Sequence, residues 1–385
     1  MRADWSYPTA IRFGPGRIAE LADACATAGI TRPLIVTDPG LLGLAPLDAA
    51  ISALANAGVD HTVFADLRPN PVGADVDAGI DAFRSGGHDG VVALGGGSAL
   101  DVGKVVAFMP GQTRPVWDFE DIGDWWTRAD PDAIAPVVAV PTTAGTGSEV
   151  GRAGVLIDES SRRKVIVFHP GMLPAVVIAD PELTVGLPPF LTVGTGFDAL
   201  SHCLEAVCSP HPHPMSHGIG VEGARLVLEN LPRVHADPGD LDGRGNMLIA
   251  AAMGAVAFQK GLGAMHALSH PISVRYGTHH GTTNAVVMPY VLAANRPAVE
   301  EPLGRLASYA GVAGGFDGLL DEILGLRAAL GVPSTLVELG VDPSTGPDIA
   351  ADAIVDPSAA GNPVPFDLPL AERMFDAACS GTLER

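Results

Sequence analysis

The sequence predicts two domains, an α/β domain with a parallel sheet followed by an all-helical domain. In the first half of the chain, short apolar runs alternate with helical stretches, which is the order that a parallel sheet with helical crossovers requires. After about residue 185 the apolar residues recur with the 3.6-residue spacing of helices instead. A chain of 385 residues is also too long for one small core, which favours two domains.

The α/β domain is predicted over residues 1–185. PLIVTD at 33–38 is a strand that ends in a turn, and helices are expected around 46–57 and 73–86. GVVALGGGSALDVGKVVAF at 90–108 is a strand, a glycine loop and a helix in succession. The alternation predicts one parallel sheet. Its remaining strands are expected at 61–66, 135–143, 164–168 and 175–180.

The all-helical domain is predicted over residues 186–385. Pro188 and Pro189 suit a linker that enters a helix, because proline fits the first helical turn. Beyond them, helical apolar spacing is found in FDALSHCLEAV, EGARLVLENL, NMLIAAAMGAVAFQ and LLDEILGLRAAL.

The composition argues against several classes of protein. A formal charge of −21 repels phosphate backbones, so nucleic-acid binding is not expected. No stretch reaches 18 uninterrupted apolar residues, so no membrane span is expected, and the first residues lack the apolar region of a signal peptide. The four cysteines are widely scattered and are expected to be buried, reduced thiols. Together these observations indicate a cytoplasmic protein.

A glycine loop at 95–98, GGGS, follows an apolar strand and opens a helix. Three glycines let the backbone approach a phosphate closely, and the start of the helix offers free N–H groups to it. Ser98 is expected to cap this helix, with Asp101 in its first turn. A phosphate site and a tight turn without a ligand both explain the spacing.

Polar residues also follow two other strands. Asp38 ends the strand at 33–38, where a carboxylate would bind a ribose 2′-hydroxyl and repel a 2′-phosphate; this favours NAD over NADP. An ordinary turn-forming aspartate is the alternative. PTTAGTGSE at 141–149 offers Thr142, Thr143 and Ser148 to phosphate or ribose oxygens, with a polar loop as the alternative. Open α/β sheets bind ligands at the carboxyl ends of their strands, so the loops support each other.

Histidines and one aspartate in the second half have the spacing of metal ligands. Asp198 and His202 in TGFDALSHCLEA are four residues apart and therefore share a helix face. GAMHALSHP repeats this spacing with His266 and His270, and His280 follows in a loop bounded by glycines. A carboxylate and imidazoles without thiolate suit Fe²⁺ or Zn²⁺, with Ni²⁺ or Mn²⁺ as further alternatives. A solvated helix face or capped core histidines would explain the same spacing without a metal.

The ordered set GGGSALDVGK, PTTAGTGSE, TGFDALSHCLEA, HALSHP and HHGTTNAVVMP resembles the iron-containing (group III) alcohol dehydrogenases. The resemblance extends from near residue 11 to about residue 310. It implies the fold that this family shares with dehydroquinate synthase, an α/β N-terminal Rossmann-like domain and an all-α C-terminal domain. AFQKGLGAMHALSHP and HHGTTNAVVMP are most similar to the branch that includes 4-hydroxybutyrate dehydrogenases. The family also implies a homodimer or a higher homo-oligomer.

The resemblance assigns roles to individual residues. The metal ligands that it implies are Asp198, His202, His266 and His280. His280 is chosen over the adjacent His279 because the family's ligand stands immediately before a glycine, and His279 has no firm role. His270 would face the substrate or the nicotinamide and pass a proton toward solvent. The residues similar to the family's nucleotide contacts are Asn70, Gly95, Gly96, Gly97, Ser98, Asp101, Thr142, Thr143, Ser148 and Lys164.

The function that the resemblance implies is a metal-dependent, NAD(H)-linked alcohol dehydrogenase or aldehyde reductase. Its small-molecule substrate would be a short primary alcohol, an ω-hydroxy acid similar to 4-hydroxybutyrate, or the corresponding aldehyde. Lys260 is a candidate for binding a substrate carboxylate, with a helix C-terminal lysine on the helix dipole as the alternative. Other functions stay open, namely a lyase of the dehydroquinate synthase type, a metal hydrolase without a nucleotide, and a non-catalytic binding protein.

Overall fold

The structure is a computed structural model that describes the chain except residues 1–6, 8 and 162. Within the described residues the chain forms two compact units. The α/β unit comprises Tyr7–Thr143 and Gly147–Leu187, and the helical unit comprises Ala144–Thr146 and Pro188–Arg385. The predicted fold class, a parallel α/β domain followed by an all-helical domain, is confirmed.

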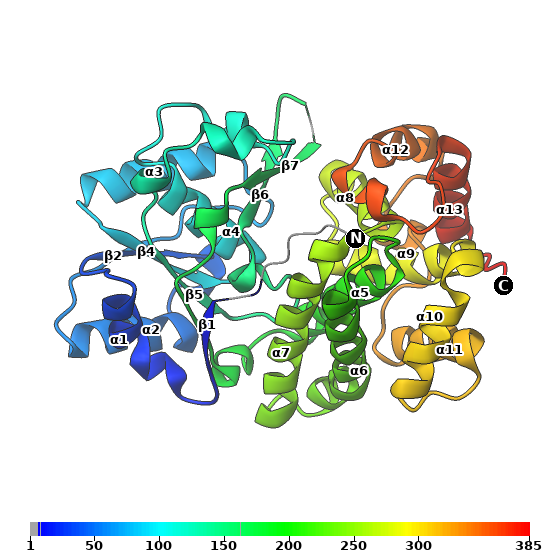
Figure 1. The fold of residues 1–385 in the computed structure, drawn as a ribbon. Helices are drawn as coiled ribbons and strands as arrows, with labels where there is room; N and C mark the ends of the chain where they lie inside the picture. The colour runs from blue at the N-terminus through cyan, green and yellow to red at the C-terminus, as the bar shows by residue number, and fades with distance from the viewer. Residues whose placement is uncertain (1–6, 8, 162) are drawn as a thin grey trace. The chain divides into compact units, whose positions relative to one another are not determined.

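A parallel sheet forms the centre of the α/β unit (Figure 1). Its central strands are near-continuous runs of buried apolar residues, which is typical of parallel sheets that are covered on both faces. Neighbouring strands pair in parallel throughout. The strand order is β1 (Ala10–Phe13), β8 (Val176–Ala179), β5 (Val137–Pro141), β4 (Gly90–Gly95), β2 (Pro33–Thr37) and β3 (Thr62–Phe64).

Alternating residues of the central strands face different helices, because successive side chains of a strand point to opposite faces. Val92 and Leu94 share a core with α1 (Leu21–Thr27) and α2 (Ala45–Asn56). On the other face, Ala93 lies against Gly103 of α4 (Gly97–Phe108), where a Cβ would come within 2.6 Å of the Ala93 Cβ. The neighbour of α4 on this side is α3 (Gly73–Ser85). Helices therefore cover both faces of the sheet (Figure 1).

The order of the strands reverses between β2 and β4. The chain runs from β2 to β3 at one edge and then returns past β2 to β4, β5 and β8. Such a reversal leaves a crevice at the carboxyl ends of the two strands, where open α/β sheets bind ligands. Asp38 follows β2 and the glycine loop follows β4, so both stand at this point.

The structure differs from the prediction for residues 164–168. The segment is a strand, β7 (Arg163–Phe168), but it pairs antiparallel with β6 (Ala153–Asp158) and does not join the parallel sheet. The connection between β6 and β7 is too short for the helical crossover that parallel strands need, so the two strands pair directly. The short edge strand β1 is another element that the sequence pattern does not predict.

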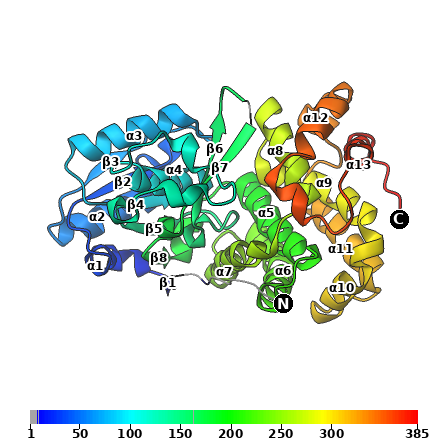
Figure 2. The same ribbon diagram turned by 45° about the horizontal axis from the view of Figure 1, so that its top comes forward.

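The helical unit is built around α5, which packs against α6, α7 and α9, and α8 packs against α9 (Figure 2). Pro189 is the first residue of α5, a position where proline lacks no hydrogen bond. The helices are α5 (Pro189–Cys208), α6 (Pro214–Ala236), α7 (Leu241–Ala257), α8 (Ala264–Tyr276), α9 (His280–Ala294), α10 (Arg296–Tyr309), α11 (Gly315–Ala329), α12 (Gly346–Ala353) and α13 (Leu368–Ser380).

An apolar core fills the helical unit and includes Phe197, Leu200 and Leu204 of α5. The same helix buries polar residues, among them Asp198 and His202. Buried polar groups are normally satisfied by a partner, so this part of α5 needs an explanation beyond packing.

The cysteines are free and buried, as the sequence predicts. Burial raises the pKa of the Cys25 and Cys203 thiols to about 12.

Among the described residues, no single helix is long and apolar enough to cross a membrane. The bent pair Leu241–Lys260 and Ala264–Tyr276 passes this test only when its two helices are taken together, by length and composition.

Candidate metal centre and nucleotide-binding loops

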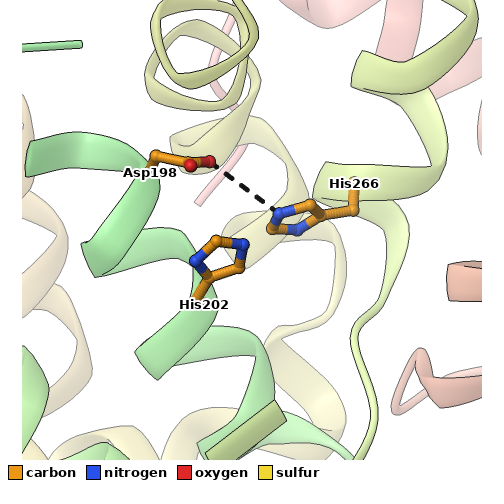
Figure 3. Close-up of side chains that lie close together, drawn as sticks. All are labelled: Asp198, His202 and His266. Carbon is orange, nitrogen blue, oxygen red and sulfur yellow. Dashed lines mark ion pairs between the residues drawn. The ribbon is translucent and has the colours of Figure 1, made fainter. Parts of the chain in front are cut away.

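Asp198, His202 and His266 lie together inside the helical unit (Figure 3). Asp198 and His202 are one turn apart on α5, so their side chains leave the helix on one face. His266 comes from the first turn of α8, and its ring stacks on that of His202 with 4.7 Å between the centroids. One ligand atom from each residue lies within 4.8 Å of the other two, and all three side chains are buried. A group this compact is able to hold one divalent cation.

His280, the first residue of α9, lies beside this group. Its Nε2 is 3.6 Å from Oδ1 of Asp198, and its ring centroid is 5.2 Å from that of His266. The His280 side chain is 23% exposed, whereas that of Asp198 is 4% exposed. The structure therefore brings together the four residues that the resemblance assigns to the metal, with His280 at the edge nearest to solvent.

Burial sets the charge of His202. It lowers the pKa of this imidazole to about 4, because the charged form would lose its hydration. His202 is therefore neutral near pH 7. A neutral imidazole carries the lone pair with which histidine binds a metal.

Glu205 supports His266 from behind, and no motif singled it out. Its two carboxylate oxygens accept hydrogen bonds from the backbone N–H of Met265 at 2.7 Å and from Nδ1 of His266 at 2.6 Å. Because a carboxylate only accepts, the proton of a neutral His266 sits on Nδ1 and the lone pair sits on Nε2. Burial opposes the charged form of His266, but the hydrogen bond and charge of Glu205 outweigh it and raise the pKa. The sequence contains one sign of this role, because Glu205 follows Asp198 by seven residues and therefore lies on the same helix face.

His270 lies next to the cluster with a second carboxylate behind it. Its ring stacks on that of His280 with centroids 5.2 Å apart, and its Nδ1 is 2.8 Å from Oδ2 of Asp356. Burial raises the pKa of Asp356, but the charge and hydrogen bond of His270 outweigh burial and lower it. Asp356 is therefore an ionised acceptor that holds the imidazole by Nδ1 and leaves Nε2 for proton exchange.

The adjacent His279 caps a helix. Its Nδ1 accepts a hydrogen bond from the backbone N–H of Thr282 at 3.2 Å, and His279 is the N-cap residue of α9. Side-chain acceptors at this position satisfy one of the free N–H groups at the start of a helix. This contact gives His279 a structural role that the sequence left open.

Lys260 is buried, and its ammonium group lies at the end of α5. Nζ donates hydrogen bonds to the backbone carbonyls of Ala206, Val207 and Ser209 at 2.8, 3.0 and 2.7 Å. An ammonium has three N–H groups, so these carbonyls use all of them. The structure thus supports the alternative in which Lys260 stabilises the C-terminal end of a helix, and not the binding of a substrate carboxylate.

Loops from three neighbouring strands meet at the carboxyl edge of the parallel sheet. Asp38 Oδ2 accepts a hydrogen bond from the Gly96 N–H, and the Thr142 N–H donates to the Gly95 carbonyl, each at 2.9 Å. A Cβ on Gly96 would lie 3.4 Å from Cγ2 of Thr143. Gly95 has a φ of +148°, and a Cβ there would come within 2.4 Å of Oδ2 of Asp38. Only glycine fits at this close approach.

Helix α4 begins at Gly97 with Gly96 as its N-cap, so the expectation that Ser98 caps it is wrong. Ser98 Oγ donates instead to the carbonyl of Pro69, the residue before Asn70. The backbone turns into the helix directly after Gly95, whose φ of +148° favours glycine. The first N–H groups of α4 have no partner within the helix, which makes them suitable for a phosphate.

Asp101 and Ser148 contact each other beneath these loops. Ser148 Oγ donates to Asp101 Oδ1, and Asp101 Oδ2 accepts from the backbone N–H of Val155 at 3.1 Å. Lys104 is only 1% exposed, lies 3.4 Å from Asp101 and donates to the carbonyl of Ser148 at 2.9 Å. These contacts tie α4 to the segment after β5.

Lys164, another residue similar to the family's nucleotide contacts, lies on β7 opposite Ile157 of β6.

The family described as iron-containing alcohol dehydrogenase matches residues 8–181, and its C-terminal counterpart, the Fe-containing alcohol dehydrogenase family, matches residues 192–378. The chain is 38% identical to a 4-hydroxybutyrate dehydrogenase of Cupriavidus necator over 367 residues, which cover 93% of this chain and 94% of that protein. The crystal structure of a 1,3-propanediol oxidoreductase is 32% identical, with a TM-score of 0.93 and coverage of 98% of this chain and 100% of that chain. A sulfoacetaldehyde reductase from Bifidobacterium kashiwanohense, solved in complex with NAD⁺, is 31% identical with a TM-score of 0.89 and 99% coverage of both chains.

The chain therefore belongs to the iron-containing alcohol dehydrogenase family and is an oxidoreductase. The resemblance seen in the motifs is confirmed, including the similarity to the 4-hydroxybutyrate dehydrogenase branch.

Gly95→Ala is expected to weaken nucleotide binding. The added Cβ would strike Oδ2 of Asp38 at 2.4 Å and the Ala99 Cβ at 2.7 Å. Backbone strain of about 1–3 kcal/mol corresponds to roughly 5- to 150-fold in affinity. Fluorescence titration with NADH measures the effect. Gly40→Ala is the matched control, because a Cβ there meets nothing within 4 Å. Equal NADH affinity in both variants would contradict the placement of the nucleotide at this loop.

Glu205→Gln is expected to weaken metal binding by about 10- to 100-fold. Glutamine has one acceptor end and one donor end, so it cannot accept from both the Met265 N–H and His266 Nδ1. A chelator competition assay measures the affinity. Glu222→Gln on α6 makes the same chemical change in a surface pair with Arg225 and is expected to bind metal as the unaltered chain does. If the two variants bind metal equally well, Glu205 does not support His266 as a candidate ligand.

Proposed function

We propose that this chain is a metal-dependent, NAD(H)-linked alcohol dehydrogenase that also reduces the corresponding aldehydes. The observation that carries the proposal is the compact, buried group on α5 and α8, with His280 at its edge. Imidazole nitrogens and one carboxylate without thiolate are typical ligands of Fe²⁺ and Zn²⁺. Family membership supports Fe²⁺, with Zn²⁺ as the alternative. The proposed ligands are Asp198, His202, His266 and His280.

The proposed ligand set fits a metal in its donor atoms. The hydrogen bond to Glu205 places the lone pair of a neutral His266 on Nε2, and burial keeps His202 neutral. When bound, the metal supplies a Lewis acid that polarises the alcohol or carbonyl oxygen. The buried side chains around it exclude water, which strengthens each electrostatic interaction at the site.

His270 is the residue that we assign to proton transfer. Oxidation of an alcohol removes a hydride from its carbon and a proton from its hydroxyl group. Nε2 of His270 accepts this proton, because Asp356 holds Nδ1 and stabilises the imidazolium that forms. In the reverse direction His270 returns the proton to the product oxygen.

The loops at the carboxyl edge of the parallel sheet support NAD as the cofactor, whose nicotinamide supplies the hydride acceptor. Asp38 suits a ribose 2′-hydroxyl and repels a 2′-phosphate, so NAD is preferred to NADP. The relative solved with NAD⁺ is 31% identical to this chain. Gly95, Gly96, Gly97, Ser98, Thr142 and Thr143 are proposed to contact the nucleotide. Asp101 and Ser148 support these loops from beneath, and Asn70 and Lys164 are proposed as further contacts.

The proposed substrate is a short primary alcohol or an ω-hydroxy acid similar to 4-hydroxybutyrate. The 38% identity to a 4-hydroxybutyrate dehydrogenase over nearly the whole chain supports the hydroxy acid. The likeness to a 1,3-propanediol oxidoreductase supports a small, flexible substrate with a terminal hydroxyl group. No observation favours a lyase of the dehydroquinate synthase type or a metal hydrolase.

We also propose that residues 1–185 bind the nucleotide and that residues 186–385 carry the metal and the catalytic histidine. Free, buried cysteines support a reducing compartment such as the cytoplasm. The family resemblance supports a homodimer or a higher homo-oligomer.

Turnover with a panel of short alcohols, diols, hydroxy acids and their aldehydes tests the proposal. The chain is reconstituted with Fe²⁺ or Zn²⁺ and assayed with NAD and NADP separately; activity with NAD is expected on at least one alcohol. His270→Ala is expected to keep its metal and lose turnover by about 10²- to 10⁴-fold, whereas His266→Ala loses both.

Two results would count against this account. Absence of NADH binding together with absence of turnover on the whole panel would refute the dehydrogenase function. A fall in metal content in His270→Ala as large as in His266→Ala would show that the two histidines have been given the wrong roles.

A further inference from the structure

Asn284 lies among the proposed metal ligands. It is fully buried on α9, one turn after His280. Its amide nitrogen, Nδ2, is 2.9 Å from Asp198 Oδ1 and 3.3 Å from the Nε2 atoms of His266 and His280. One side-chain nitrogen therefore contacts three of the four residues that we propose as ligands. These contacts come from α5 and α8 as well as from its own helix.

The neighbours of Asn284 determine which end of its amide faces them. Asp198 presents a carboxylate oxygen, which only accepts hydrogen bonds. His266 presents a lone pair at Nε2, because its Nδ1 proton is taken by Glu205. An amide carbonyl turned toward these atoms would meet electron-rich groups, whereas the NH₂ end donates to them. The donor end of Asn284 is thus fixed toward Asp198 and the imidazoles.

Packing does not account for an asparagine at this position. The other end of the amide, Oδ1, is buried and has no hydrogen-bond partner within the described part of the chain. A buried polar atom without a partner costs about 1–3 kcal/mol. An apolar side chain would occupy this position without that cost, so the role of Asn284 lies in its Nδ2 end.

We propose that Asn284 is a positioning residue of the metal centre, which orients the Asp198 carboxylate by donating a hydrogen bond to Oδ1. The lone pair of an imidazole Nε2 cannot serve both an N–H group and a cation. A carboxylate oxygen has more than one lone pair and serves both. The contact with Asp198 is therefore the one that persists when a cation binds. This inference rests on the metal site of the proposed function.

Asn284→Leu tests the inference, because it keeps the branched shape of the side chain and removes the donor. The dissociation constants of Zn²⁺ and Co²⁺ are measured by competition with a chelator, and the visible absorption spectrum of the Co²⁺-loaded chain reports the ligand geometry. The expected result is about 10- to 100-fold weaker binding and a changed Co²⁺ spectrum.

Asn230→Leu is the matched control. Asn230 is an equally buried amide on α6 that donates to the carbonyl of Leu226, away from the ligands. The control is expected to lower the melting temperature without moving the metal affinity or the Co²⁺ spectrum. Where Asn284→Leu does not fold, Asn284→Ala takes its place, and the same loss of affinity is expected.

The outcomes separate this inference from the function on which it rests. Unaltered Zn²⁺ and Co²⁺ affinities with an unaltered spectrum in a folded Asn284 variant would overturn the role of Asn284 alone. Failure of the unsubstituted chain to bind either metal would overturn the metal site, and the role of Asn284 with it. An equal loss of affinity in the Asn230 variant would show that burial of an amide, and not contact with Asp198, controls metal binding.

Discussion

The polar face of α5 imposes the strongest constraint on this structure. Asp198, His202 and Glu205 are each at most 5% exposed as whole residues, and they lie beside a large apolar core. Buried ionisable groups are tolerated only when they are paired, hydrogen-bonded or bound to a metal. The neighbouring helices supply these partners: Asn284 donates a hydrogen bond to Asp198, and His266 donates one to Glu205. The packing of α8 and α9 against α5 is thus inseparable from the chemistry of the site.

The start of α8 combines the proposed ligand His266 with the contacts that hold its helix in place. Its N-cap residue, Gly263, has no side chain to satisfy the first N–H groups of the helix. These groups are satisfied from elsewhere in the fold, by Asn362 Oδ1 for Ala264 and by Glu205 for Met265. The same Glu205 carboxylate then holds the ring of His266. One side chain therefore fixes both the position of the helix and the orientation of the imidazole that the helix carries.

Local patterns in the sequence predict the parts of the site that lie close together in the chain. The four-residue spacing of Asp198 and His202 depends only on helix geometry, and the glycine loop depends only on the passage from strand to helix. The same reasoning predicts the fold class and places the glycine loop and the segment at 141–149 at one sheet edge, where the Thr142 N–H donates to the Gly95 carbonyl. It misplaces the cap of α4, because Gly96 is the N-cap residue and the helix begins at Gly97, one residue before Ser98.

The supporting contacts depend on tertiary structure and leave little trace in the sequence. Asp356 stands 86 residues from His270, and Asn284 stands 86 residues from Asp198. An aspartate or asparagine in isolation has many ordinary roles, so neither can be paired with its histidine or carboxylate before the helices are packed. The antiparallel pairing of β7 with β6 is missed for a related reason, since strand direction is decided by the connection and not by the strand itself.

The most direct test of the metal centre is anomalous X-ray diffraction from crystals of the Fe²⁺-loaded chain, collected at the iron absorption edge. The account predicts a peak bound by a carboxylate oxygen of Asp198 and by ring nitrogens of His202, His266 and His280, with Nε2 as the ligand atom of His266. Coordination of His266 through Nδ1, a ligand role for His270 or His279 in place of His280, or a peak elsewhere in the chain would contradict it.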